Sequence, residues 1–484
     1  MKYLASSVKR LFLGLKWYET SEYALLMMLA VTIPIQWRIA LWCLILLCAN
    51  TFAKTIYQYR QPQGTDRQRR FQTNPALSRP VRACLWAMVF YYLLYAVSGI
   101  YSNNPSEALS TIQTMLPLLL FPLIFLFGDT RYLTRRHLSL LTFLLAATLT
   151  IRFILILIRS GFHSIDSQLF SGTTHLFATL IAQLASWFSQ ITPFSQLNDL
   201  IAIQPLRAIA HLFNNTPFEY LKAYTFDPLH HNYLALYLLT AIALLYTELV
   251  RHWKACRWHC LRWFVIVDII LLSAYILLCG SRSGMVAWGL LVTACFLHLA
   301  LAQHQWRTLG IILAVMVILI GITYLASPKT YTRVTDTAKL LLRGEEGDIR
   351  QTMWLSGLQT IKDRPIWGYG CDGYWDALKH QYREHDCLTA SSYQFSPHNQ
   401  YLETTLATGL VGLVAMLAMI LLPVWFSLHR RHRNLPMILF TVAYATCIFF
   451  EASFGRQMGL LFIGFWYCIL LHYSRPAPVP META

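Results

Sequence analysis

Long apolar runs follow one another through most of the chain. Each is about as long as an α-helix that crosses a lipid bilayer, which needs roughly 17–25 predominantly apolar residues. We therefore predict an all-α polytopic integral membrane protein with about twelve transmembrane helices. The predicted spans are residues 22–36, 38–57, 83–100, 109–127, 138–158, 231–250, 263–279, 284–302, 308–326, 403–428, 436–452 and 457–473.

The charged residues support this class and orient the chain. Only 13% of the 484 residues are charged, whereas soluble domains have about 25%. When the spans alternate, the basic loops 59–82, 129–137, 251–262, 304–307 and 429–434 fall on the same side as the basic N-terminus. Lys and Arg are enriched in cytoplasmic loops, so we expect a multi-pass membrane protein with both termini in the cytoplasm. The net charge of +16 then belongs to these loops, and nucleic acid is not expected as a partner.

Two long segments face outward in this topology, within what we interpret as a single transmembrane domain, 1–484. Segment 160–230 is predicted to be an amphipathic outer loop, because the polar residues of its apolar stretch 175–191 lie on one helical side. Segment 327–402 is rich in charges, Trp and Tyr and is expected to form a folded cap. It contains Cys371 and Cys387, which could form a disulfide in an oxidising compartment or remain free thiols.

Polar residues from distant parts of the sequence meet at the outer end of the predicted spans. Ionisable groups in a membrane are costly and tend to mark function. Arg282 lies in a turn between Gly280 and Gly284, and its planar guanidinium suits phosphate recognition. Glu451 and Arg456 could belong to the same site or form a structural ion pair. The full set is His231, Asn232, Arg282, His398, Glu451 and Arg456.

The stretch SPHNQYLETTLATGLVGLV, residues 396–414, joins the outer cap to a span. We predict that Ser396 caps the helix and that Pro397 is its first residue. His398 would then lie in the first turn, where the helix dipole favours a neutral imidazole that can accept a proton. The alternative is a His that only makes a local hydrogen bond. Gly409 and Gly412 are expected to allow close helix packing.

These residues resemble the signature of the O-antigen ligase and O-antigen polymerase superfamily of bacterial envelope glycosyltransferases. In that signature a His and an Asn are followed by nine residues and Gly-x-x-Gly, as at His398, Asn399, Gly409 and Gly412; Leu413 departs from the Thr or Tyr that ends it. The GSRSG turn, the HHNYLA start of a span, and the segment RQTMWLSGLQTIKDRPIWGYG with Arg350 and Trp354 are also similar to the family. The resemblance covers roughly residues 225–470.

The resemblance implies a GT-C-like, metal-independent inverting transferase with no cofactor. Its donor would be a glycan on undecaprenyl diphosphate at the periplasmic face. Arg282 and Arg350 would hold the donor diphosphate, and His398 would be the general base on the acceptor hydroxyl. Supporting roles are expected for Asn399, Trp354, His231, Asn232, Glu451 and Arg456.

The acceptor is the point that these residues leave open. We favour a ligase that uses lipid A-core, because no additional soluble domain is evident in the sequence. A polymerase that joins lipid-linked repeat units, or a relative that transfers the glycan to protein, is the alternative within the family. From another class, a lipid-linked glycan flippase would be expected to have repeats and midplane polar groups, whereas the polar residues here gather at one end.

Overall fold

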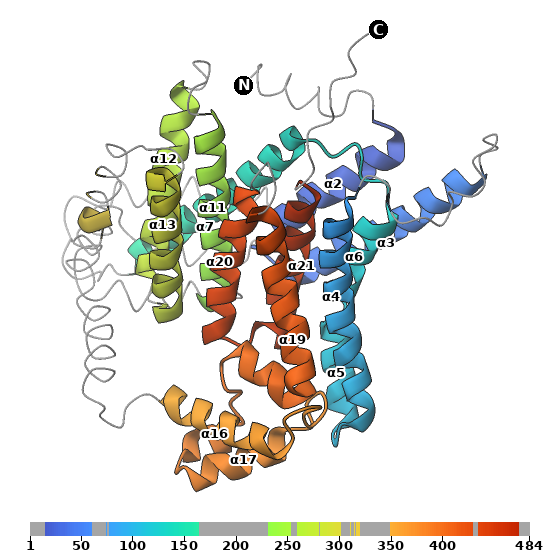
Figure 1. The fold of residues 1–484 in the computed structure, drawn as a ribbon. Helices are drawn as coiled ribbons and strands as arrows, with labels where there is room; N and C mark the ends of the chain where they lie inside the picture. Colours follow the sequence, from blue (N-terminus) through green and yellow to red (C-terminus); the bar gives the residue numbers. More distant parts are fainter. Residues whose placement is uncertain are drawn as a thin grey trace.

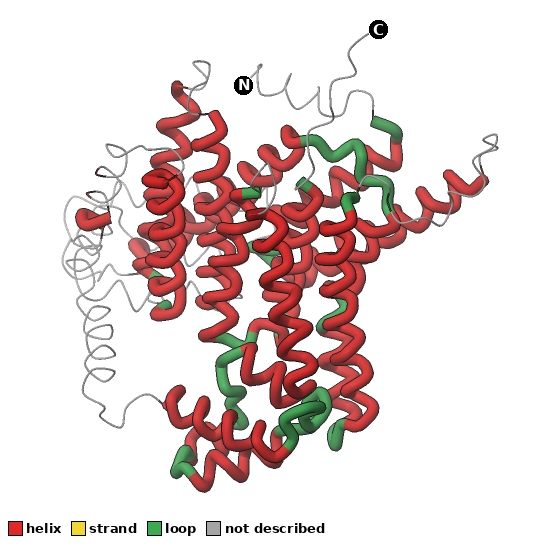
Figure 2. Tube along the Cα trace, in the orientation of Figure 1, coloured by secondary structure: helices red, strands yellow, loops and turns green. Residues whose placement is uncertain are grey.

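The described part of the chain is helical and contains no strand, as Figures 1 and 2 show. The computed structural model describes residues 15–60, 74, 77–163, 231–252, 259–279, 281–301, 310, 314, 316–319, 349–428 and 434–473. The helices that form the bundle are α2 (Trp17–Thr32), α3 (Trp37–Arg60), α4 (Arg79–Ser98), α5 (Pro105–Thr114), α6 (Pro117–Phe127), α7 (Arg135–His163), α11 (His231–His252), α12 (His259–Leu278), α13 (Arg282–Leu301), α19 (Gln400–Leu428), α20 (Leu435–Phe450) and α21 (Gln457–His472). Three further helices, α16 (Ile349–Asp363), α17 (Trp375–Glu384) and α18 (Leu388–Tyr393), lie at one end of it.

Several helices begin at a proline, which explains where the apolar runs start to be helical. Proline at the first helical positions lacks an N–H that would be unpaired there in any case. Pro105 and Pro117 begin α5 and α6, and Pro436 follows the first residue of α20. Asn434 caps α20, because its side chain accepts a hydrogen bond from the backbone N–H of Met437.

The structure confirms a polytopic all-α membrane protein, but it does not support twelve full-length spans. Seven described helices are long and apolar enough to cross a membrane, and the pair α5–α6, bent by 41°, would be an eighth. α2, α20 and α21 have only 16 residues each, which is about 24 Å of helix against a hydrocarbon core of about 30 Å. α20 stops early because Glu451 leaves the helix in an extended conformation.

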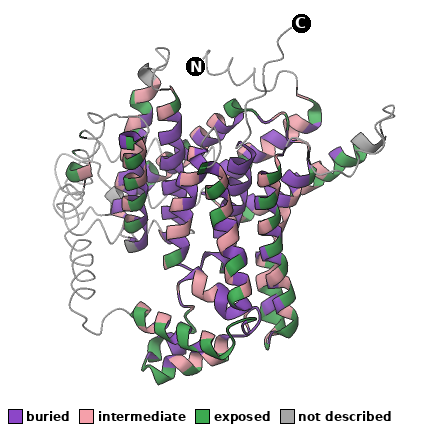
Figure 3. Ribbon diagram, in the orientation of Figure 1, coloured by how far each residue is buried: buried purple, intermediate pink, exposed green. Residues whose placement is uncertain are grey.

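Helix α11 lies at the centre of the bundle, and the helices around it expose apolar side chains. It packs against α7, α12, α13 and α20, and every residue from 232 to 248 is buried. Figure 3 shows this buried interior beside exposed faces on α12, α13 and α19. The exposed faces contain large apolar residues such as Trp263, Phe264, Val414 and Trp425. Apolar side chains of this size on an outer face suit contact with lipid.

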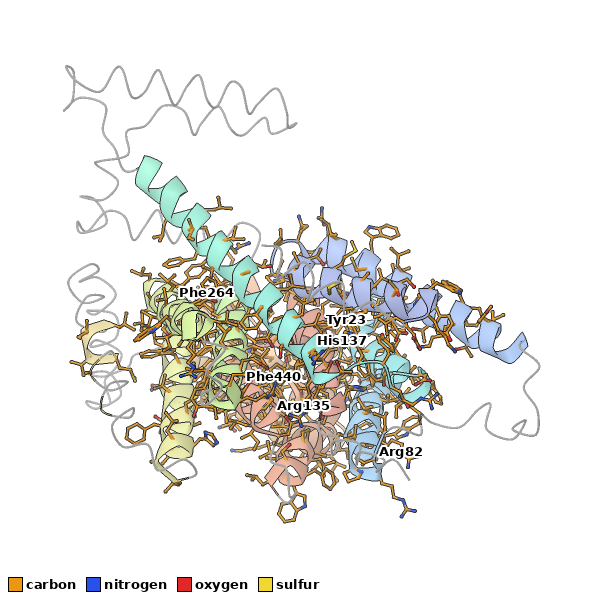
Figure 4. All side chains as sticks on the ribbon, turned by 90° about the horizontal axis from the view of Figure 1, so that it is seen from above. Tyr23, Arg82, Arg135, His137, Phe264 and Phe440 are labelled. Carbon is orange, nitrogen blue, oxygen red and sulfur yellow. The ribbon has the colours of Figure 1, made fainter. Side chains whose placement is uncertain are left out.

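One end of the bundle is held together by polar contacts between the early helices. Viewed from that end, α7 crosses the bundle and His137 lies beside Tyr23 of α2 (Figure 4). The Tyr23 hydroxyl donates to the His137 carbonyl at 3.2 Å. Lys54 of α3 forms a fully buried ion pair with Glu22 of α2 at 2.7 Å. The second partner of the Lys54 amine is the carbonyl of Asp129, also at 2.7 Å, so this pair ties α2 and α3 to the loop before α7.

At the opposite end, a loop of the 349–402 segment pairs with a break in α19. Gly409 has φ 67° and ψ −165° inside this helix, so the carbonyls of Leu406 and Ala407 are released from helical bonding. They accept hydrogen bonds from the N–H groups of Tyr369 and Gly370 at 2.8 and 2.9 Å. Gly409 therefore breaks the helix, and the loop that contains Tyr369 and Gly370 packs against the break. This role differs from the close helix–helix packing predicted for Gly409.

Some predicted features lie outside the described residues. They include the outer segment 160–230 apart from the end of α7, and most of the predicted span 308–326. Of the predicted outer segment 327–402, residues 349–402 are described. We call α16, α17 and α18 with their connecting residues up to Ser396 the cap.

Candidate active site

The ends of four helices meet beneath the cap. The starts of α11, α13 and α19 lie next to the end of α20, and residues 395–399 lead from the cap into α19. The predicted site residues on these elements are therefore brought together, although they are far apart in the sequence. His231 and His398, for example, are 167 positions apart. Hydrogen bonds link several of them directly.

His398 lies just before α19 and not in its first turn, which corrects the predicted cap. The helix begins at Gln400, and His398 has the left-handed φ of 48°, which is uncommon for a residue other than glycine and is often found at functional sites. Asn399 is the residue that caps the helix, because its side-chain oxygen accepts from the N–H groups of Tyr401 and Leu402 at 2.9 and 3.2 Å. Ser396 accepts from the N–H of His398 at 3.3 Å.

His398 is paired with Glu451. Its Nδ1 lies 3.1 Å from Oε1 of Glu451. The imidazole is 31% exposed, whereas the carboxylate is only 11% exposed. When Nδ1–H donates to the carboxylate, Nε2 is the nitrogen that can accept a proton from a substrate. This is the arrangement of a general base whose ring is oriented by a buried acid.

A second set of bonds connects Glu451 to the turn that contains Arg282. The side-chain amide of Asn232 donates to the other carboxylate oxygen, Oε2 of Glu451. The Asn232 carbonyl oxygen in turn accepts from the hydroxyls of Ser281 and Ser283 at 2.9 and 2.7 Å. Four helix ends thus share one hydrogen-bonded chain, and this fixes the orientation of Glu451 behind His398.

The residues around Arg282 explain the small residues of the GSRSG turn. Ser281 accepts from the N–H of Gly284 at 3.1 Å and so caps α13. A Cβ on Gly284 would lie 2.8 Å from Cβ of Ala235, so this glycine allows α13 to approach α11. The glycine therefore has a packing role in addition to the tight turn predicted for it.

Of the two arginines predicted to hold a diphosphate, the structure describes the side chain of Arg350 but only the backbone of Arg282. Arg282 is the first residue of α13 and lies between the two serines, but its side chain lies outside the described part of the structure. Arg350 is the second residue of α16 in the cap and is half-buried. His231 is the first residue of α11, directly before Asn232. Among the described residues, no cluster of His, Cys, Asp and Glu is arranged to hold a metal ion.

Trp354 connects the cap to the segment that contains His398. Its indole N–H donates to the carbonyl of Pro397 at 2.9 Å. Its ring makes an edge-to-face contact with Phe449 near the end of α20, at 5.3 Å between centroids. This tryptophan therefore holds the backbone on one side of His398, and its supporting role in the reaction stays a prediction.

Two other expectations are corrected by the structure. Arg456 is exposed at the start of α21, and the described residues show no ion pair between Arg456 and Glu451. Cys371 and Cys387 are free, buried thiols and do not form the possible disulfide. Their surroundings explain this: the thiol of Cys371 faces the Ala108 carbonyl at 3.9 Å, whereas Cys387 follows α17 and its N–H bonds to the Tyr382 carbonyl.

Sequence reasoning missed several polar residues of the site. Ser281 and Ser283 flank Arg282. A serine on each side of a candidate phosphate-binding arginine was the sequence signal that could have identified them. Gln400 is fully buried, and its side-chain oxygen accepts from the N–H of Phe454 at 2.7 Å. No sequence signal distinguished it from an ordinary polar residue at a helix start, since its partner lies 54 positions away.

Known proteins are similar to part of the chain. Residues 269–417 match the family described as O-antigen ligase; this segment contains Arg282, Arg350, His398 and Gly409, whereas Glu451 lies beyond it. An uncharacterized protein of Haemophilus influenzae is 31% identical over 206 residues, which cover 39% of this chain and 51% of that protein. The chain thus spans about half the length of the relative that it matches. Residues 269–417 are therefore similar to the O-antigen ligase family.

Proposed function

We propose that this protein is an O-antigen ligase-type glycosyltransferase of the GT-C-like kind. It moves a glycan from undecaprenyl diphosphate to lipid A-core at the periplasmic face of the bacterial inner membrane, with both of its termini in the cytoplasm. The observation that carries the proposal is the His398–Glu451 pair, at 3.1 Å, beside the family's Ser-Arg-Ser turn.

In the proposed reaction, His398 is the general base. The acceptor hydroxyl gives its proton to Nε2 of His398 while its oxygen attacks the anomeric carbon of the donor sugar. The bond between that carbon and the diphosphate oxygen breaks, and the configuration at the carbon is inverted. Glu451 stabilises the imidazolium that forms, because a buried carboxylate lowers the energy of a cation that lies next to it.

Arg282 and Arg350 have the complementary role at the leaving group. Negative charge develops on the diphosphate as the bond breaks, and preorganised positive charge at that place lowers the barrier. A guanidinium binds phosphate oxygens through two parallel N–H groups. Arg282 begins α13 and Arg350 lies in the cap, so the two would approach the diphosphate from the bundle and from the cap.

The test is a transfer assay in a reconstituted membrane. Purified protein and a labelled undecaprenyl-diphosphate glycan are incubated with lipid A-core, and in parallel without it. We expect label on lipid A-core, and a loss of roughly 10²–10⁴-fold in rate for His398→Ala, the range for removal of a general base. His380→Ala is the matched control, since this histidine is 70% exposed on the cap, and it should keep full activity.

Other outcomes would change the assignment. Full activity of His398→Ala, at normal protein levels, would contradict the proposed base. Longer lipid-linked chains without transfer to core would make the protein a polymerase. Lipid-linked glycan that appears in the opposite leaflet, with no new glycosidic product, would make it a flippase.

A further inference from the structure

Two exposed aromatic rings lie beside His398, and the proposed mechanism does not use them. Tyr393 is 72% exposed and Phe395 is 36% exposed. Their rings are stacked, with centroids 5.6 Å apart and planes at 17°. The Phe395 ring is 6.0 Å from the imidazole of His398. The two stacked rings therefore form an exposed aromatic pair next to the proposed base.

The backbone of the cap holds these rings in place. Gln394, between them, has the left-handed φ of 49° that ends α18. The N–H of Phe395 donates to the Ala390 carbonyl at 3.1 Å, and its carbonyl accepts from the buried Tyr382 hydroxyl at 3.0 Å. Burial raises the pKa of the Tyr382 phenol, so this hydroxyl stays protonated as a donor. A surface that is fixed before binding loses little conformational entropy when a ligand arrives.

The chemistry of the exposed rings points to a carbohydrate. One face of a pyranose ring is lined by C–H groups, which carry partial positive charge, and the face of an aromatic ring is negative. Packing the two against each other buries apolar area and is compatible with water around the sugar hydroxyls. Exposed aromatic side chains that gather next to a reactive group, and are not scattered singly, indicate a binding surface.

We propose that Tyr393 and Phe395 form an aromatic platform that binds a sugar ring of the glycan next to the one that reacts at His398. This inference rests on the proposed function, because it assumes that the substrate is a glycan. The sugar can belong to the donor or to the acceptor, since in the proposed reaction both bring sugars to His398. In either case the platform positions a substrate and takes no part in bond making.

The rival explanation is that these rings only anchor the cap at the membrane surface, where Trp and Tyr are enriched. Trp367 allows the two explanations to be separated. It is another exposed aromatic residue of the cap, at 63%, but it lies by the break in α19, where its carbonyl accepts from the Tyr101 hydroxyl at 2.7 Å. Membrane anchoring would make Trp367 as important as Tyr393, whereas sugar binding would not.

The experiment compares Tyr393→Ala, Tyr393→Phe, Phe395→Ala and Trp367→Ala in full-length protein. KM is measured separately for donor and for acceptor in the transfer assay. Binding of two soluble oligosaccharides, one with the donor's repeat unit and one with the core sugars, is measured by saturation-transfer NMR without turnover. For Tyr393→Ala we expect KM for one substrate to rise by about three- to tenfold, the range of one aromatic contact, with kcat within about twofold. Tyr393→Phe and Trp367→Ala should resemble the wild type.

The outcomes distinguish this inference from the proposed function. The substrate whose KM rises, and whose oligosaccharide loses its NMR signal in Tyr393→Ala, is the one on the platform. Unchanged KM and unchanged binding in both Tyr393→Ala and Phe395→Ala would overturn the platform, and the transfer reaction could still depend on His398. Equal effects of Trp367→Ala and Tyr393→Ala would also overturn it. Sugar binding that needs Tyr393 in a protein without transfer activity would support the platform and contradict the proposed reaction.

Discussion

Among single residues, Glu451 is the side chain that orients His398. Its two carboxylate oxygens bond to different partners, Nδ1 of His398 and the side-chain amide of Asn232. Both oxygens are therefore used as acceptors, and the carboxylate cannot turn without losing one bond. In the proposed reaction, a carboxylate in this position would stabilise the positive charge that forms on the imidazole, and a neutral residue of the same shape would not.

We predict that Glu451→Gln lowers the transfer rate by roughly 10²–10⁴-fold, comparable to loss of the base itself. The amide has one acceptor oxygen and one donor nitrogen, so it cannot accept from both His398 and Asn232. The rate is measured in the reconstituted assay, and thermal unfolding in detergent serves to check that the variant is folded. Arg456→Ala is the comparison. Equal losses in the two variants would contradict a specific role of the His398–Glu451 pair.

Among the elements, the broken helix α19 links the membrane bundle to the cap. Beyond the bonds that Leu406 and Ala407 accept, the N–H of Leu410 donates to the Pro365 carbonyl at 2.8 Å. The break thus exchanges helical hydrogen bonds for bonds to the cap loop, and irregular backbone at this depth is tolerated because protein covers it. The cap is attached to the same helix that begins two residues after His398.

We predict that Gly409→Ala destabilises the protein and reduces transfer. A Cβ at this position would lie 2.0 Å from the Ile366 carbonyl oxygen, and a non-glycine residue at this φ adds strain of about 1–3 kcal/mol. The measurement is the Tm in detergent together with transfer activity. Gly289→Ala in α13 is the control, because nothing lies within 4 Å of its Cβ position, and helix propensity favours alanine there by about 0.5–1 kcal/mol. A similar Tm for the two variants would show that the break does not need glycine.

At the scale of the whole molecule, the cap and the basic α6–α7 loop lie at opposite ends of the bundle. The cap helices are at one end, and the C-terminal end of α11 and the loop before α7 are at the other (Figure 1). Because positive loops stay in the cytoplasm, this separation predicts which end faces outward. It also predicts that an odd number of membrane crossings separates the α6–α7 loop from the cap.

This orientation can be measured by labelling of single introduced cysteines in intact cells. Lys362→Cys lies on an exposed position of α16, and Arg131→Cys replaces a side chain that is 69% exposed in the α6–α7 loop. We expect a membrane-impermeant maleimide to label Lys362→Cys in spheroplasts, and Arg131→Cys only after permeabilisation. Wild-type protein gives the background from the native thiols. The reverse labelling pattern would place the proposed site in the cytoplasm.

The sequence predicted the features of the fold that depend on local pattern. Apolar runs of the right length predicted α3, α4, α7, α11, α12 and α13, because helix formation in lipid follows local composition. The motif residues Asn399, Arg350 and Trp354 could be named in advance, since their spacing is a property of the chain. The early C-terminal end of α20 and the break in α19 could not be predicted from the sequence. Each depends on a partner more than forty positions away, such as Ile366 for Gly409.

By itself, then, the amino-acid sequence determined that this chain is a helical membrane protein and that His398 and Arg282 lie near the same end of it. Only the tertiary structure decided that Glu451 pairs with His398, that His398 lies before the helix in a left-handed conformation, and that Cys371 and Cys387 stay apart. The physical reason is the range of the interactions. Hydrophobic burial follows the composition of each segment, whereas a hydrogen bond requires two atoms within about 3 Å, and that geometry exists only after the helices have packed.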